Sequence, residues 1–406
     1  MASSTSAIRL VGSSSLAPSV SFTRASGAIY TGQDNTTLYQ VGNDVPRFNG
    51  PAKRLLIEGQ RTNYIRNPRF DGATAPTTGP TYTTGFVGNA SGVARTIVGT
   101  GTAFGRPYID VAFTGTSSVN QLHTVNFENA GVAAAEGQVW TLSGAVMLIS
   151  GSFAGYNTCN LNVRPRDASN VDTNGTGYYS APITPETATP VLATVTSGAL
   201  PATTASIQTV LRMNTLAGQV CNEVFRIFAP QLELAPFASS LILPPVGTPA
   251  LTTRANDLAT YLLTAAHRQR GTLVGTFMLP QAAGADIQCL LSLDPNNSGN
   301  RLTIQNSSNG AQLRGVQIIA GATAQTSVLA TFTPSVPFRA AIAWDATGVS
   351  WCVMGSAVST LAGLPEIDRL RLGNDVLGQR AAFGEFGVLD LYPTRLPDPV
   401  LQALTS

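Results

Sequence analysis

Residues 338–358 read FRAAIAWDATGVSWCVMGSAV, and this stretch predicts two β-strands joined by a tight turn. Apolar residues fill both arms, and DATG at 345–348 separates them with a glycine that is free to adopt positive φ. On the second arm Val349, Trp351 and Val353 alternate with other residues, which is the period of a strand with one buried face. We therefore expect a hairpin within a β-rich domain.

The same two-residue period recurs through the middle of the chain. In YIDVAFT at 108–114, polar or small residues alternate with Ile109, Val111 and Phe113. Between residues 64 and 245, such strand signals recur between turns at roughly the spacing typical of sandwiches, about ten residues. Helical periodicity is nearly absent. The pattern predicts a β-sandwich or jelly roll.

Composition supports the same fold class. A chain of 406 residues is long enough for two domains, each with its own core. Charged residues make up only 11%, far below the usual quarter, whereas disordered chains are usually highly charged. We predict an all-β protein with an N-terminal arm followed by two β-sandwich domains.

Turn signals and prolines divide the chain into three parts. Residues 1–63 begin with a Ser- and Ala-rich segment and continue as short strands with hairpin turns. Residues 64–250 carry the repeated strand signals and end in a proline-rich stretch at 244–249, which stiffens a connection. Residues 251–406 form a second β-rich part. We expect an arm and two domains with these bounds.

Several classes of protein are disfavoured. The net charge is +2 and the basic residues are scattered arginines, with Lys53 the only lysine, so nucleic-acid binding is not expected. No apolar run of membrane-spanning or signal-peptide length occurs, so membrane insertion is not expected either. No C-x-x-C occurs, which disfavours zinc. The cysteines expected as buried free thiols are Cys159, Cys221, Cys289 and Cys352.

Three sequence blocks carry a family resemblance. FTRAS lies at 22–26, VPRFNGPAKRLLIEGQRTN at 45–63, and PQLELAPFASSLILPPVGTPALTTRAND at 230–257. In this order they resemble tail-fibre and head-spike proteins of tailed bacteriophages and of phage-like gene transfer agents. The resemblance implies that the arm attaches to the virion and that a jelly roll like a carbohydrate-binding module follows it.

The last part of the chain resembles a second fold. The WDATG hairpin is followed by RLRLGN at 369–374 and GEFGVLDLY at 384–392, an order similar to the concanavalin A-like, laminin G-type sandwich. A short closing helix is expected after DP at 398–399, whose aspartate suits the N-cap and whose proline suits the first helical position. Leu401 and Leu404 would dock this helix.

A candidate sugar-binding stretch lies at 155–180, GYNTCNLNVRPRDASNVDTNGTGYYS. Aromatic faces can stack on a sugar ring, and polar side chains can bond its hydroxyls. The alternative is that its tyrosines pack on neighbouring strands. The candidate carbohydrate-binding residues are Tyr156, Asn157, Arg164, Arg166, Asp167, Tyr178 and Tyr179. The tryptophans expected in cores are Trp140, Trp344 and Trp351.

Glu58, Arg61 and Asn63 stand at fixed places in the family-like block at 45–63. We expect a structural role, in which Arg61 pairs with Glu58 or caps carbonyls where the arm meets the sandwich.

No catalytic residue is predicted. His123 and His267 accompany no G-x-S-x-G motif. Glu366 and Asp368 form a local acidic pair that a glycosidase could use, but the arginines beside them favour a solvated strand end. The chain is therefore not expected to be an enzyme.

No cofactor is expected. Asn- and Asp-rich stretches at 167–172 and 294–297 could hold a structural calcium ion, but such residues favour turns without any metal.

These features predict a spike or fibre protein of a phage or phage-like particle that binds host-surface polysaccharide. Many weak sites on a symmetric oligomer would give avidity. The family resemblance implies a trimer, and a fivefold or a monomeric attachment at a vertex stays an alternative. Other virion proteins would be partners, on a particle assembled in the bacterial cytoplasm and presenting this chain at its surface. Two alternatives stay open: a purely architectural decoration or connector protein, and a depolymerase of capsule polysaccharide.

Overall fold

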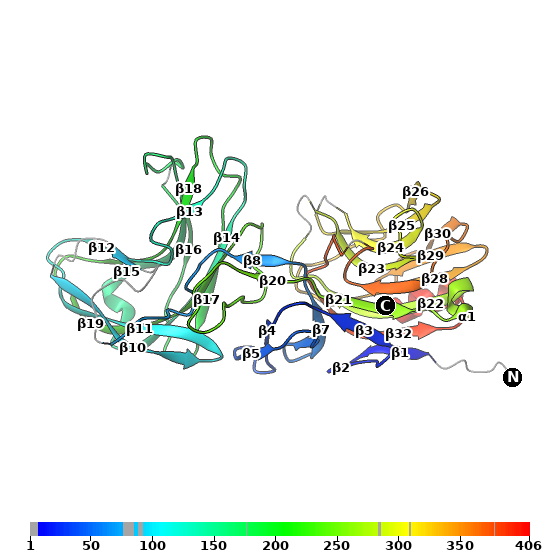
Figure 1. Ribbon diagram of the computed structural model, residues 1–406, viewed down its shortest axis with the longest axis horizontal. Helices are drawn as coiled ribbons and strands as arrows, with labels where there is room; N and C mark the ends of the chain where they lie inside the picture. The colour runs from blue at the N-terminus through cyan, green and yellow to red at the C-terminus, as the bar shows by residue number, and fades with distance from the viewer. Residues whose placement is uncertain are drawn as a thin grey trace. The chain divides into compact units, whose positions relative to one another are not determined.

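The computed structural model describes residues 7–75, 85–87, 92–175, 177–282, 286–307, 310–376 and 378–406, and these are nearly all β-structure (Figure 1). The chain forms two compact units. Unit 1 holds the described residues up to 35, together with 39–60 and 254–406. Unit 2 holds residues 36–38 and the described part of 61–253. In both units antiparallel sheets enclose an apolar core, so the chain is an all-β protein built of sandwiches.

Unit 1 contains two large sheets, and its first and last strands are neighbours. The order in the first sheet is β2 (Ser15–Leu16), β1 (Ile8–Gly12), β32 (Gly384–Tyr392), β22 (Gly271–Met278), β28 (Phe338–Asp345), β29 (Gly348–Val353) and β30 (Ser359–Ala362). Two further strands extend it from β32, namely β7 (Arg54–Ile57) and β6 (Arg47–Asn49).

The second sheet of unit 1 also takes a strand from near the N-terminus. Its order is β26 (Ala322–Gln325), β25 (Gln312–Ile319), β24 (Arg301–Asn306), β23 (Gln288–Asp294), β31 (Arg369–Leu372), β21 (Leu258–Leu262) and β3 (Val20–Thr23). Outside this order, β27 (Ala330–Thr331) pairs with β25, and β4 (Ala28–Thr31) pairs with β5 (Leu38–Val41).

The predicted hairpin at 338–358 is confirmed. Strands β28 and β29 pair with Asp345 opposite Gly348, and Val349, Trp351 and Val353 lie in the core of unit 1. Trp351 packs on the opposite sheet: a Cβ added at Gly315 would lie only 2.5 Å from its Cδ2 atom. The glycine is what allows the indole to fit at this place.

The prediction of a separate arm at 1–63 differs from the structure. Strand β1 pairs with β32, β3 pairs with β21, and β7 pairs with β32, so the described residues up to 60, apart from 36–38, belong to unit 1. Short strands leave unpaired backbone groups, and the edges of the two large sheets supply the missing hydrogen bonds. The sequence carried no signal for these partners, because they lie more than 200 residues away along the chain.

Unit 2 consists of two sheets with a core between them. The first has the order β10 (Val93–Ala103), β11 (Arg106–Thr116), β19 (Val220–Glu233), β14 (Thr141–Ser150) and β17 (Val191–Thr196). The second has the order β16 (Tyr179–Pro182), β15 (Tyr156–Arg166), β18 (Ser206–Thr215), β12 (Gln121–Asn126) and β9 (Gly85–Val87), with β13 (Val132–Ala133) on β18. A two-stranded ladder joins β8 (Arg61–Asn63) and β20 (Thr252–Arg254), and a short 3-10 helix spans Phe153–Gly155.

The alternation read at 108–114 is confirmed in β11. Ile109, Val111 and Phe113 are fully buried in the core of unit 2. The cores also contain the residues predicted for them: Trp140, Trp344 and Trp351 are buried, and so are the free thiols of Cys159, Cys221, Cys289 and Cys352.

Two helices are present in the described part of the chain, α1 (Ala265–Gln269) and α2 (Asp398–Thr405). Helix α2 docks as predicted, because Leu401 is buried and Leu404 packs partly buried against the same cluster. Its N-cap is Pro397 rather than Asp398, which takes the first helical position instead. There the carboxylate still favours the positive end of the helix dipole. Neither helix is long and apolar enough to cross a membrane.

Candidate functional site

The strongest candidate for a ligand surface is the outward face of the second sheet of unit 2. Along β15, Leu161 and Val163 turn into the core, so the residues between them turn outward. The register places Asn160 opposite Arg212 and Arg164 opposite Gln208 on the neighbouring strand β18. We call the following set the polar face: Asn160, Asn162, Arg164, Arg166, Tyr178, Gln208 and Arg212.

An aromatic ring lies on the polar face beside a cation. The guanidinium carbon of Arg212 lies 4.0 Å from the centroid of the Tyr178 ring. Both side chains are partly exposed. A cation–π contact at such a place stabilises by about 0.5–1 kcal/mol and holds the ring in position. An ordered aromatic ring next to a hydrogen-bond donor is the combination that sugar recognition needs.

Two arginines of the polar face, Arg164 and Arg166, share one carboxylate, that of Asp172. Asp172 lies 2.8 Å from Nη2 of Arg164 and 3.4 Å from Nε of Arg166. Arg166 also donates to Oδ1 of Asn170 at 2.7 Å. Burial lowers the pKa of Arg166, and the charge of Arg164 lowers it further. One carboxylate shared by two guanidiniums leaves donor capacity facing outward.

Asn162 adds a polar atom that lacks a partner. Its side chain is fully buried, and its Nδ2 donates a long hydrogen bond of 3.4 Å to the carbonyl of Tyr179. Its Oδ1 accepts no hydrogen bond from the residues that the structure describes. A buried acceptor in this state costs about 1–3 kcal/mol, so a water or a ligand hydroxyl bound here would stabilise the site.

Arg164, Arg166 and Tyr178 are thus predicted residues that the fold brings together. Sequence analysis missed Arg212 and Gln208, because they lie on a strand more than 30 residues further along. The signal that could have found them is the alternation in SIQTVLRMNT at 206–215, where Gln208, Arg212 and Asn214 fall on one face.

The inclusion of Tyr156 among the sugar-binding residues was wrong. Its side chain is buried and packs edge-on against Phe113 and Phe225 in the core. Its hydroxyl donates to Oε2 of Glu223 at 2.9 Å. Burial, and then the charge of Glu223, raise the pKa of Tyr156. Tyr156 is therefore a core residue that packs on neighbouring strands, which was the alternative to sugar binding.

The remaining candidates have different surroundings. Asp167 holds a turn, because its Oδ1 accepts from the backbone of Ser169 at 2.9 Å and of Val171 at 2.8 Å. Tyr179 lies opposite Val163 and packs partly buried against the core. Asn157 is exposed at the beginning of β15. None of these three belongs to the polar face.

The three family-like sequence blocks converge on a second feature, which is buried in unit 1. We call it the ion network, and its members are Arg24, Arg47, Glu58, Arg254 and Asp257. All five side chains are at most 6% exposed. The N-terminal blocks supply the first three and the block at 230–257 supplies the last two.

Each carboxylate of the ion network bridges two arginines. Glu58 Oε2 lies 2.8 Å from Arg47 and 2.9 Å from Arg254. Asp257 lies 2.9 Å from Arg24 and also contacts Arg47, and it accepts from the backbone N of Glu58 at 2.8 Å. Burial lowers the pKa of Arg47, but the two carboxylates outweigh that effect and raise it. These bonds fasten the N-terminal hairpins to the sandwich.

Arg61 and Asn63 belong to unit 2, whereas Glu58 belongs to unit 1. Arg61 lies over the ring of Phe237 and 3.9 Å from a carboxylate oxygen of Glu233. Asn63 is fully buried and uses both ends of its amide. Its Oδ1 accepts from the backbone N of Ile65 and Leu232, and its Nδ2 donates to the carbonyls of Pro230 and Ile242, over 3.0–3.3 Å.

The acidic residues and the histidine that were weighed for catalysis differ in their burial and in their charged neighbours. Glu366 is exposed, and Asp368 lies 2.7 Å from Arg369, whose hydrogen bond lowers the pKa of Asp368. His123 is buried, and burial followed by the charge of Arg95 lowers its pKa to about 4.

In the stretches where a calcium ion was predicted as possible, the side-chain oxygens already accept hydrogen bonds from the protein. Asp294 is buried, accepts from the backbone N of Asn296 at 2.9 Å and lies 3.0 Å from Arg371. Asn297 accepts from the backbone N of Gly299 at 3.0 Å, as in a turn. In the part of the chain that the structure describes, no three His, Cys, Asp or Glu side chains gather as a metal site would require.

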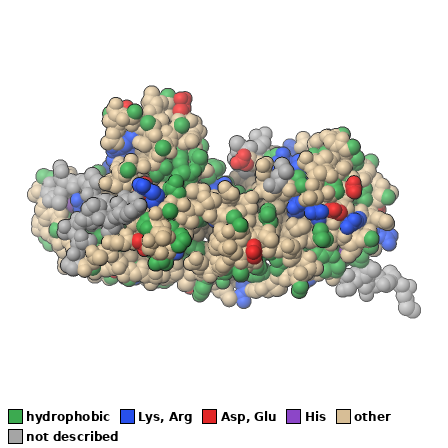
Figure 2. Space-filling view, in the orientation of Figure 1, with side chains coloured by type: hydrophobic (Ala, Val, Ile, Leu, Met, Phe, Trp, Pro, Cys, Tyr) green, Lys and Arg blue, Asp and Glu red, His purple; other side chains and the backbone are tan. Residues whose placement is uncertain are grey.

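Charged residues make up only 11% of the chain. Figure 2 shows mostly polar and apolar atoms on the visible face, with charged side chains in small separate groups.

Comparisons with known proteins give remote likenesses. No protein-family model and no curated protein matches the chain. Among solved structures, a CBM40 from a Ruminococcus gnavus IT-sialidase, bound to alpha2,3 sialyllactose, is 18% identical. The match covers 34% of this chain and 83% of that one, with a TM-score of 0.28.

Two longer matches are similarly remote. The tandem CBM22 domains of Paenibacillus barcinonensis Xyn10C match at 11% identity over 80% of this chain and 97% of that one, with a TM-score of 0.27. A Trypanosoma rangeli sialidase matches at 11% identity over 77% of this chain and 62% of that one, with a TM-score of 0.29. At TM-scores this low, the likenesses carry no argument, and the assignment to the β-sandwich class rests on the sheets themselves.

Proposed function

We propose that this chain is a surface protein of a phage or phage-like particle that binds host polysaccharide through the polar face. The observation that carries the proposal is the ordered Tyr178 ring beside Arg212, next to outward arginine and amide groups. Stacking on the ring and hydrogen bonds from the guanidiniums and amides would together recognise a sugar.

The rest of the proposed role follows from the family-like blocks in the sequence. The chain would be assembled in the bacterial cytoplasm, would contact other particle proteins through unit 1, and would act as a symmetric oligomer such as a trimer. Repeated weak sites on such an oligomer would give firm adhesion. We propose binding without catalysis, so the purified protein should release no reducing ends from the polysaccharides that it binds.

Affinity electrophoresis through gels that contain purified bacterial capsular polysaccharides or lipopolysaccharides would test this proposal. The wild-type protein should be retarded by at least one of them. Arg212→Ala and Tyr178→Ala should each weaken this binding about tenfold, which corresponds to about 1.4 kcal/mol. Arg339→Ala, an exposed arginine of unit 1, is the matched control and should migrate like the wild type. Equal retardation of all four proteins would refute the role of the polar face.

A further inference from the structure

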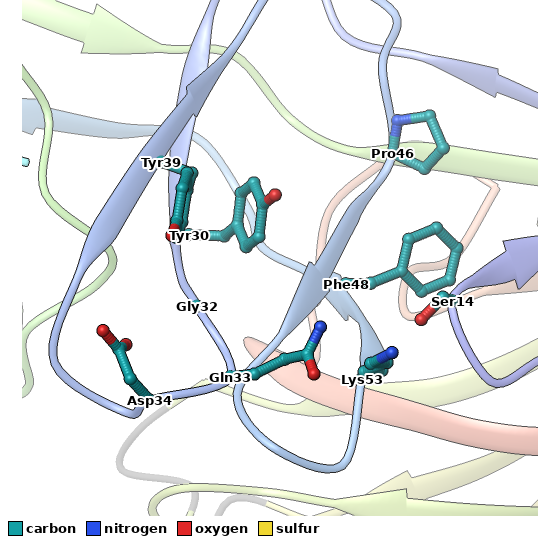
Figure 3. Close-up of a pocket in the computed structure, with 9 residues that line it drawn as sticks. All are labelled: Ser14, Tyr30, Gly32, Gln33, Asp34, Tyr39, Pro46, Phe48 and Lys53. Atoms are coloured by element: carbon teal, nitrogen blue, oxygen red, sulfur yellow. The ribbon is translucent and has the colours of Figure 1, made fainter.

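Unit 1 contains a cavity of about 490 Å³ that lies among the tips of three hairpins, apart from the polar face (Figure 3). The β1–β2 turn contributes Ser14, the loop after β4 contributes Gly32, Gln33 and Asp34, and the turn before β7 contributes Lys53. We call this cavity the hairpin pocket. Its volume lies within the range of small-molecule binding sites, about 300–1,000 Å³.

Aromatic rings form the walls of the hairpin pocket. Tyr30 and Tyr39 stack with their ring centroids 5.7 Å apart and their planes 29° apart. Tyr39 is 50% exposed, a high fraction for so large a ring. Phe48 lies across the cavity from Tyr30 and packs partly buried on the core of unit 1 (Figure 3). The pocket therefore offers ring surface to a ligand from two sides.

The polar groups of the hairpin pocket include donors and acceptors of both charges. Gln33 and Lys53 lie on the side of Phe48, and Asp34 lies on the side of Tyr39 (Figure 3). Lys53 is the only lysine of the chain, and it lines the pocket together with Asp34. One cation and one anion leave the pocket without a net charge, so it does not favour a phosphate or another strong anion.

The hairpin pocket is held in shape by bonds between its hairpins. The backbone N of Thr31 donates to Oδ1 of Asn49, and the backbone N of Gly50 donates to the carbonyl of Thr31, both at 2.8 Å. Ser14 donates from its backbone N to the carbonyl of Lys53 at 3.3 Å. Ser14 and Lys53 have φ values of 61° and 49°, which cost a non-glycine residue energy and persist only where the surroundings fix them.

We propose that the hairpin pocket binds one hexopyranose residue of a polysaccharide. The C–H face of the sugar would lie on the Tyr39 ring. Its hydroxyls would accept from Lys53 and Gln33 and donate to Asp34. A pyranose needs both donors and acceptors around an apolar face, and this pocket supplies all three without net charge. The inference rests on the proposed function only in the choice of a sugar as ligand, since it places the sugar on the other unit.

Saturation-transfer difference NMR on the full chain would test the hairpin pocket. The probes are the methyl glycosides of glucose, galactose, mannose and N-acetylglucosamine. At least one should receive magnetisation from the wild-type protein. Tyr39→Phe keeps the ring and should keep the signal, whereas Tyr39→Ala should reduce it at least fivefold. Because Tyr39 is half exposed, neither change should alter the thermal unfolding of the protein, which a melting curve checks.

The outcomes separate the hairpin pocket from the polar face. A signal that is lost in Tyr39→Ala and kept in Arg212→Ala supports the pocket. A wild type that gives no signal with any of the four sugars, or a signal that survives in Tyr39→Ala, overturns it. Retardation by polysaccharide gels that depends on Arg212 would leave the proposed function standing in either case.

Discussion

Replacing Asp257 by Asn in the ion network should strongly destabilise unit 1. The side chain is buried, and the change removes the negative charge that Arg24 faces at 2.9 Å and that Arg47 also contacts. Arg47 and Arg254 would keep Glu58 as a partner, whereas Arg24 would lose its ion pair. Breaking a buried ion pair by removing one partner costs about 3–5 kcal/mol, and we expect a loss of that size.

Asp390→Asn is the matched control for this change. It removes a carboxylate from the same unit, but its partner Arg9 has a side chain that is 60% exposed. Exposed ion pairs stabilise by about 0–1 kcal/mol, so the control should cost no more than that. The two substitutions have the same chemistry and differ in burial, which isolates the effect of the interior.

Urea unfolding followed by tryptophan fluorescence would measure both effects. The chain has three tryptophans, and in a Trp140→Phe background the signal comes from Trp344 and Trp351, which lie in the core of unit 1. The midpoint for Asp257→Asn should fall well below that for Asp390→Asn. If the two variants unfold with the same free energy, the ion network does not fasten the N-terminal hairpins as argued.

Three further predictions concern single residues. Asn63→Ala should lower the melting temperature of unit 2 in calorimetry, because it removes four hydrogen bonds and costs on the order of 3 kcal/mol; an unchanged transition would contradict this. His123 stays neutral in the fold, since its pKa is lowered from 6.5 to about 4. The fold favours the neutral ring, so the free energy of unfolding should be highest above pH 6.5 and should decrease by about 3 kcal/mol as the pH falls to 4. His123→Gln should flatten this pH dependence of the free energy of unfolding. Gly315→Ala should cost about 1–3 kcal/mol through overpacking on Trp351, and a neutral effect in urea unfolding would show that the indole can shift.

The sequence predicted those parts of the fold that depend on local patterns. The alternation at 108–114 and the DATG turn at 345–348 report their surroundings directly, because neighbouring residues point to opposite faces of a strand. Pairings over long distances left no such trace. The strand at 8–12 pairs with residues 389–391, and no local sequence pattern in either segment predicts this pairing.

The candidate site shows the same division. Arg164 and Tyr178 were accessible to sequence reasoning, because one polar stretch contains both. Arg212 was not, since only the register between β15 and β18 places it there. Tyr156 was misassigned because strand position alone does not tell which of two faces is the core, and here Glu223 satisfies the buried hydroxyl.

The position of unit 2 within the chain has a consequence for biosynthesis. Residues 61–253 leave the ribosome as one continuous run, so their sandwich can close while translation is still in progress. Strand β1 must wait for β32, and the Arg9–Asp390 pair spans 381 positions. Until the last strand has been synthesised, the segment ahead of unit 2 carries exposed strand edges, which makes it the part of the nascent polypeptide most in need of a chaperone.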